Sequence, residues 1–150
     1  MADLTTTVTE SVVLNGALRG NTNTVTTTGI NNVFERIVTC AHSQTTTVAV
    51  FGATPHASAG AIDVENVRYL RVTNLDLDGT LVLAVVTTNT NYQVRLTPGT
   101  SHIIARGEAV IIGETDTSPA FGTLENIVTL QVRPEGTSYN PQVAVFVGLV

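Results

Sequence analysis

Threonine and valine dominate this chain of 150 residues and constrain its fold more than any other feature. It contains 26 Thr and 22 Val, the two commonest residue types. Side chains branched at Cβ lose rotamer freedom in helices but pack well on the pleated surface of a sheet. A chain of this length suits one domain that buries roughly 70% of the surface its unfolded form exposes. We therefore expect residues 1–150 to form a single all-β domain with little or no helix.

Short β-prone runs recur along the chain with turn residues between them, and no longer window keeps a helical spacing of apolar positions. Roughly ten short, mostly antiparallel strands at this spacing predict a β-sandwich or a jelly roll. The expected strands are residues 5–14, 23–28, 36–40, 45–51, 67–74, 81–87, 92–96, 101–105, 110–113, 127–133 and 142–147.

Three dipeptides mark turns between these strands. Asn15-Gly16 and Asp78-Gly79 supply residues that tolerate a positive φ, and Pro98-Gly99 is typical of a type II turn. With these turns, residues 70–96 are expected to form a meander.

The pattern of side chains within the strands indicates which faces are buried. Leu70, Val72 and Asn74 share one face and Arg71 and Thr73 share the other, with the arginine side expected to point outward. Residues 81–86 are apolar on both faces, which predicts a central strand covered by the second sheet and by another element or subunit. Residues 142–150 are apolar to the last position, so we expect them to be paired in a sheet or buried against a neighbouring chain.

Charge and composition exclude several classes of partner. All seven basic residues are Arg, and twelve carboxylates give a net charge of −5, which argues against capture of nucleic acid by the whole surface. The N-terminus lacks the features of a signal peptide and no apolar stretch is long enough to span a membrane, so we expect synthesis in the cytoplasm. Only 13% of residues are charged, which hints at contacts between subunits.

The single cysteine begins the one cluster that resembles a reactive site. Cys40 and His42 lie two residues apart, but zinc needs three or four such ligands and the sequence holds no second cluster. Cys40 as a nucleophile with His42, His56 or His102 as its base has no local support, because no nucleophile elbow or glycine-rich oxyanion segment is present. We expect an inert, buried thiol, and the sequence predicts no catalytic residue, metal site or cofactor.

Two further clusters have ordinary structural explanations. Asp76 and Asp78 are expected to be solvated carboxylates of a hairpin turn, since an EF-hand loop would require more oxygen ligands. Arg68 and Arg71 flank Tyr69, a pattern that could bind single-stranded nucleic acid by stacking. Pairing of these arginines with carboxylates, within the fold or across a subunit interface, is the more economical interpretation.

Several runs together resemble a known group of proteins. They are residues 13–16 (VLNG), 20–24 (GNTNT), 29–33 (GINNV), 36–39 (RIVT), 67–74 (VRYLRVTN), 96–101 (LTPGTS) and 143–147 (VAVFV). In these runs the chain resembles small β-rich virion proteins of tailed bacteriophages, especially those that infect cyanobacteria and other aquatic bacteria. The resemblance implies a jelly-roll or sandwich subunit, a homotrimer, that lies on the outside of a capsid or within the tail.

From this resemblance we expect a non-enzymatic capsid decoration, or cement, protein that binds the major capsid protein and stabilises the shell. The expected contact segments are residues 2–10, the loop 52–60 and the C-terminal strand. A tail, neck or fibre-base component is the alternative within the virion. A carbohydrate-binding or adhesive module is the alternative of another class, although sugar platforms rely on exposed aromatic rings and this chain has seven aromatic residues and no Trp. The third class of function considered is an enzyme.

Overall fold

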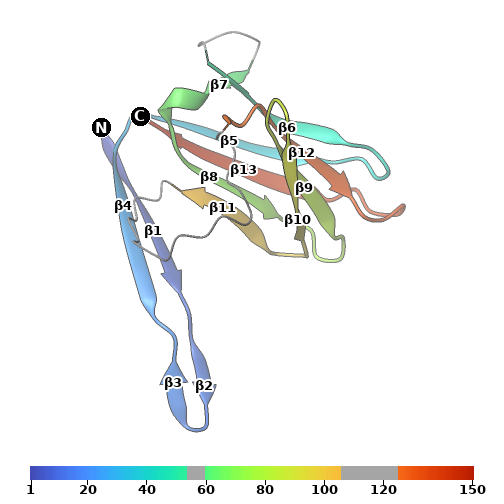
Figure 1. Cartoon of the computed structure of the whole chain (residues 1–150). Helices are drawn as coiled ribbons and strands as arrows, with labels where there is room; N and C mark the ends of the chain where they lie inside the picture. Colours follow the sequence, from blue (N-terminus) through green and yellow to red (C-terminus); the bar gives the residue numbers. More distant parts are fainter. Residues whose placement is uncertain (54–59, 106–124) are drawn as a thin grey trace, which may run out of the picture.

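The computed structural model describes residues 1–53, 60–105 and 125–150, and in this part the chain is almost entirely β-strand (Figure 1). This confirms the predicted fold class. The elements are β1 (Ala2–Thr9), β2 (Val12–Leu14), β3 (Ala17–Arg19), β4 (Thr22–Ile30), β5 (Asn32–Thr39), β6 (Thr46–Gly52), β7 (Ala61–Asp63), the 3-10 turn η1 (Val64–Asn66), β8 (Val67–Asn74), β9 (Leu81–Val86), β10 (Asn91–Leu96), β11 (Ser101–Ala105), β12 (Thr129–Pro134) and β13 (Gln142–Leu149).

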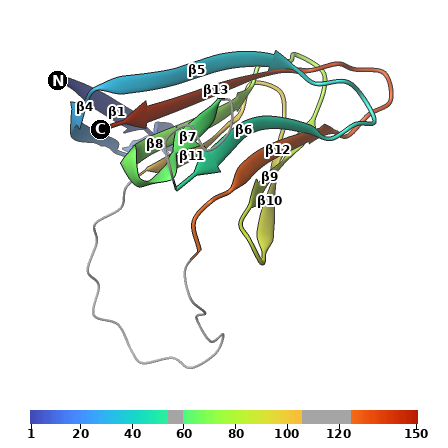
Figure 2. The same ribbon diagram turned by 90° about the horizontal axis from the view of Figure 1, so that it is seen from above.

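Two sheets pack face to face as a sandwich, which we call the body (Figure 2). One has the strand order β10-β9-β12-β6-β7 and the other the order β11-β8-β13-β5. All pairs are antiparallel except β6 with β7. The core between the sheets is built from alternate residues of each strand, as a half-buried sheet requires. Its fully buried side chains include Leu70, Val72, Leu81, Leu83, Val85, Leu130, Val132, Val143, Val145 and Val147.

The expected inner faces of individual strands are confirmed, whereas the element or subunit expected to cover the outer face of residues 81–86 is not seen in the described part of the chain. Leu70, Val72 and Asn74 are buried on the inner face of β8, while Arg71 and Thr73 are half-buried on its outer face. β9 is central in its sheet, between β10 and β12. β13 is central in the other sheet, between β8 and β5, so the apolar C-terminal run is paired along both edges.

The predicted meander over residues 70–96 is wrong. β8 pairs with β11 and β13, whereas β9 pairs with β10 and β12, so residues 75–80 carry the chain from one sheet to the other. Neither Asp78 nor Gly79 has a positive φ, contrary to expectation. Position 79 requires glycine for a steric reason instead, because a Cβ there would lie 2.6 Å from Asp76 Oδ2 and 3.2 Å from Tyr139 Cβ.

The other two predicted turns are confirmed. Asn15 and Gly16 both have positive φ, 51° and 75°, as a type I′ hairpin turn demands. At Pro98-Gly99, Gly99 has a φ of 73° and the Thr100 amide donates to the Thr97 carbonyl at 3.1 Å, which is the arrangement of a type II turn.

Some strand boundaries differ from those expected. The expected strand 5–14 is interrupted at Glu10-Ser11, which separates β1 from β2. The short strands β3 and β7 were not expected, and the expected strand 110–113 lies outside the described residues. In the described part of the chain, no helix has the length and apolar character needed to cross a membrane.

The first 30 residues form a long two-stranded ribbon, which we call the arm. β1 pairs with β4 and, beyond a break, β2 pairs with β3. At its root the arm lies over the outer face of the sheet β11-β8-β13-β5, and its far end, residues 12–19, projects beyond the body (Figure 1). We call residues 12–19 the arm tip.

Candidate functional surfaces

Cys40 and the histidines do not assemble into a reactive site in the described residues. Cys40 is fully buried, and its thiol lies 4.0 Å from the Val38 carbonyl. The His42 ring contacts Asn140 Oδ1 at 3.0 Å, and the His102 ring contacts the Tyr92 hydroxyl at 3.0 Å. His56 lies outside the described residues. In residues 1–53, 60–105 and 125–150, no group of three or more His, Cys, Asp and Glu side chains is arranged to hold a metal ion.

The Cys40 thiol is expected to be inert in the folded protein. Burial raises the pKa of this thiol above its usual value, and a hydrogen bond with Thr46 offsets part of the rise. The reactive thiolate is therefore scarce at neutral pH. We expect iodoacetamide to label Cys40 at least about 100-fold more slowly in the native protein than in guanidinium, because labelling requires local opening. Labelling at the rate of the unfolded chain would show that Cys40 is accessible and would reopen its role as a nucleophile.

Asp76 stabilises the turn between the two sheets. Its Oδ1 accepts hydrogen bonds from the amides of Leu77 at 2.7 Å and Asp78 at 3.4 Å, as in an Asx turn. The turn predicted at Asp76 and Asp78 is therefore present, but it joins different sheets and is not a hairpin.

Arg68 and Arg71 do not pair with carboxylates in the described part of the chain, and the pairing expected within the fold or across a subunit interface stays a prediction for the carboxylates outside it. Arg68 donates to the backbone carbonyls of Glu65 at 2.8 Å and Val67 at 3.1 Å. The Arg71 guanidinium lies 5.7 Å from the centre of the Phe146 ring, and among the described residues its buried Nε has no hydrogen-bond partner. The arginine side of β8 therefore faces outward, as expected, but supports the arm root rather than an open surface.

Exposed aromatic rings, on which a carbohydrate platform would depend, are few in the described residues. Tyr92 and Tyr139 are each 46% exposed, whereas Tyr69 is buried edge-to-face against Phe146 at 6.0 Å. The Tyr92 ring packs edge-on against His102 at 5.9 Å, and burial raises the pKa of its hydroxyl.

Glu125 fixes the loop between β9 and β10 to the segment that precedes β12. Its carboxylate accepts from the Thr87 hydroxyl at 2.5 Å and from the Asn89 amide at 3.1 Å, and it also bonds the Asn89 side chain. These hydrogen bonds stabilise the ionised form and lower the pKa of Glu125.

The root of the arm packs against the body at specific residues. Leu4 lies against the bare backbone of Gly148, where a Cβ would stand 3.4 Å from Leu4 Cδ2 and 3.5 Å from Ile30 Cδ1. A cavity of about 360 Å³ between the root and the sheet is lined by both, including Thr6, Arg71 and Phe146. Because Ile30 is also buried, the arm is anchored at both of its strands.

The arm tip exposes apolar side chains on both of its faces. Val12, Val13, Leu14 and Leu18 are 55%, 70%, 59% and 72% exposed. Val13 and Leu18 are opposite each other in the register and form one face of the ribbon. Gly20 lies where the pairing of β1 with β4 gives way to that of β2 with β3, and it has a φ of 114°. Only glycine fits at this position, because a Cβ would overlap the Glu10 carbonyl.

The second surface is a groove along the outer face of β9, with a volume of about 550 Å³. Its lining comprises Val82 and Ala84 of β9, Gln93 of β10, residues 131–134 of β12, the turn residues 135–137, and Ser43 and Thr45. The register places Gln93 and Gln131 on either side of Ala84, and Arg95 and Arg133 on either side of Val82, and of these four polar residues all but Arg95 line the groove. Arg95 is paired with Glu135 at 2.8 Å, the one ion pair in the described residues.

Sequence reasoning missed both surfaces. The arm has a signal in the sequence: β-prone runs of similar length flank Asn15-Gly16, and such a dipeptide between strands predicts a hairpin. The groove has no such signal, because its residues come from three strands and two further segments, and periodicity does not specify how these are ordered in space.

Comparison of the chain with protein-family models, with curated proteins and with solved structures found no match.

Proposed function

We propose that this protein is a non-enzymatic structural component of a virion, a capsid decoration or cement protein that binds the major capsid protein as a homotrimer. The observation that carries the proposal is the arm, a ribbon that extends from a rigid sandwich and ends in exposed apolar side chains. Such a patch on a monomer marks a surface for another protein. The resemblance of the sequence to phage virion proteins is the reason for proposing a virion as the assembly to which this other protein belongs.

The segments expected to contact the shell differ in their suitability. Residues 2–10 contain β1, most of which is exposed and which pairs along one edge only among the described residues. β13 has both edges paired and its inner side chains buried, so it can offer little surface to a partner. The loop 52–60 lies mostly outside the described residues. The arm is therefore the segment that we assign to contacts in the assembly.

Co-sedimentation with capsids tests this proposal. We expect the purified protein to pellet with capsids assembled from the major capsid protein of a tailed phage of aquatic bacteria, and to raise the temperature at which those shells break. A ligand that binds only the assembled state stabilises it by mass action. Binding to isolated tails but not to capsids would indicate that the protein is a tail component instead. Binding to neither would contradict a virion role.

A further inference from the structure

We propose that the cavity between the arm root and the body binds a small organic carboxylate, whose charged group pairs with Arg71 and whose apolar part lies against Phe146. Such a site goes beyond the proposed function, because it concerns a small-molecule ligand and not the contact with a shell. Three observations support it: the charge at Arg71, the walls of the cavity, and the second charge that lies near it.

Arg71 is a half-buried cation that is not neutralised in the described part of the chain. The ion pair of the described residues joins Arg95 to Glu135, and the buried Nε of Arg71 has no hydrogen-bond partner among them. A charged donor that is taken out of water without a partner costs more free energy than a neutral one. A carboxylate matches a guanidinium well, because its two oxygens accept two parallel N–H bonds. Arg71 therefore favours a carboxylate at this position.

The strand register fixes what surrounds this guanidinium. Arg71 is opposite Phe146 on β13 and opposite Ile103 on β11, so its side chain leaves the sheet between an aromatic and an aliphatic residue. Leu4 and Thr6 are half-buried on the face of β1 toward the body and line the cavity from the other side. The guanidinium is thus enclosed by apolar side chains from both the arm and the body.

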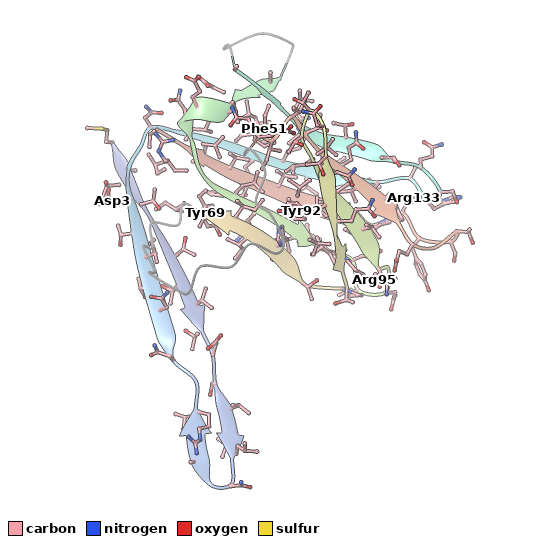
Figure 3. All side chains as sticks on the ribbon, viewed as in Figure 1. Asp3, Phe51, Tyr69, Tyr92, Arg95 and Arg133 are labelled. Carbon is pink, nitrogen blue, oxygen red and sulfur yellow. The ribbon has the colours of Figure 1, made fainter. Side chains whose placement is uncertain are left out.

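The cavity has the size and lining of a site for a small molecule. Its volume is about 360 Å³. Ligand sites range over about 300–1,000 Å³ and are mostly apolar with a few placed polar groups. Ser101 lines the cavity, and its hydroxyl lies 2.8 Å from that of Thr73; when Thr73 donates in this bond, the Ser101 hydrogen is free to donate to an anion. Tyr69 also lines the cavity, and in Figure 3 it lies on the side of the body that faces the arm. These walls suit a carboxylate attached to a small apolar group.

Glu35 limits the charge that the ligand carries. It is opposite Phe146 on the β5 side, so Glu35 and Arg71 flank the same residue on the outer face of the sheet. Two strand spacings separate them, about 10 Å, which is about one Debye length in 0.1 M salt. At this distance the two do not form an ion pair, but the negative charge of Glu35 still repels an anion bound at Arg71. A monocarboxylate is therefore favoured over a doubly charged phosphate.

An NMR titration of the isotope-labelled whole protein with sodium benzoate tests the proposal, because benzoate joins one carboxylate to one apolar ring. We expect one site with a Kd of about 1 mM or tighter. The amides that shift should be those of residues 4–7, 71 and 101, which line the cavity. Benzamide, which has the same shape without the charge, should bind at least about 10-fold more weakly, and so should inorganic phosphate, because it lacks an apolar part.

The variant Arg71→Met separates binding from a structural role, since methionine keeps an apolar reach toward Phe146 without the charge. The affinity for benzoate should fall about 10- to 100-fold, as expected for loss of a hydrogen bond to a charged group. The melting temperature of the ligand-free variant should equal or exceed that of the wild type, because an unpaired buried charge is costly. Arg36→Met is the matched control. It removes the same charge from an exposed position of β5 outside the cavity and should change the affinity less than about 2-fold.

Three results would overturn the proposal. One is a wild type whose amides do not shift at benzoate concentrations well above the expected Kd; a lower melting temperature of Arg71→Met would then mean that Arg71 is paired within the chain. The second is benzoate binding that Arg71→Met leaves unchanged. The third is equal affinity for benzoate and benzamide, which would make the cavity a site for apolar molecules and not for carboxylates. These measurements involve no capsid, so the proposed function is tested separately.

Discussion

Replacement of Leu83 by alanine is expected to lower the free energy of unfolding by about 3 kcal/mol and the melting temperature by roughly 10 °C. Leu83 is fully buried at the middle of β9, an inner strand of its sheet. Truncation removes apolar contacts and leaves a cavity that surrounding β-strands cannot close, and the cost for a buried Leu is typically 2–5 kcal/mol. Because domains are stable by only about 5–15 kcal/mol, this is a large fraction of the total.

The measurement is urea denaturation followed by far-UV circular dichroism, since the chain has no tryptophan to report by fluorescence. Leu77→Ala is the matched control, because Leu77 is 87% exposed and its truncation should change the free energy of unfolding by less than about 0.5 kcal/mol. Equal effects at the two positions would mean that β9 does not lie in the core.

Burial was predictable from the sequence where strand periodicity encodes it. The alternation of apolar and polar side chains along residues 70–74 indicated the inner face of β8, and the continuous apolar run at residues 81–86 indicated a central strand. Both features are local, because successive side chains of a strand point to opposite faces wherever the strand is paired.

Strand order was not predictable, because it depends on pairings between distant residues. Residues 70–96 contain turn signals between successive strands, and these signals are the same whether the chain turns back within one sheet or crosses to the other. In the structure β8 and β9 belong to different sheets, and β9 pairs with β12, which lies more than 40 residues later.

The arm shows a different limit of sequence reasoning. Residues 5–9 and 22–28 are mostly Thr, which has high β-propensity but is compatible with either buried or exposed faces. In the structure these threonines pair across the ribbon, with Thr7 and Thr24 hydroxyls 3.2 Å apart. Propensity thus predicted strands correctly, but whether those strands join the sandwich or leave it is set by packing around Leu4 and Ile30.

Asn74 is the buried polar residue of the described core, and it joins the two sheets at one end. It is fully buried at the end of β8. Its Nδ2 donates to the carbonyls of Gly79 at 2.8 Å and Leu96 at 3.0 Å, and its Oδ1 accepts from the Asp76 amide at 3.0 Å. One side chain therefore satisfies the backbone of the turn into β9 and of the end of β10.

Replacement of Asn74 by alanine is expected to lower the free energy of unfolding by about 3 kcal/mol, because each buried group left without a partner costs about 1–3 kcal/mol and part of this is recovered by relaxation or entry of water. The comparison is with Asn91→Ala, at an exposed position that begins β10, where the loss should stay below about 0.5 kcal/mol. Native-state hydrogen exchange should show the loss first at the amide of Asp76, which donates to Asn74 Oδ1, whereas the Gly99 amide keeps its bond to the main-chain carbonyl of residue 74. If Asn74→Ala were as mild as Asn91→Ala, the two turns would be held by their own backbone hydrogen bonds, and Asn74 would not be the link between the sheets.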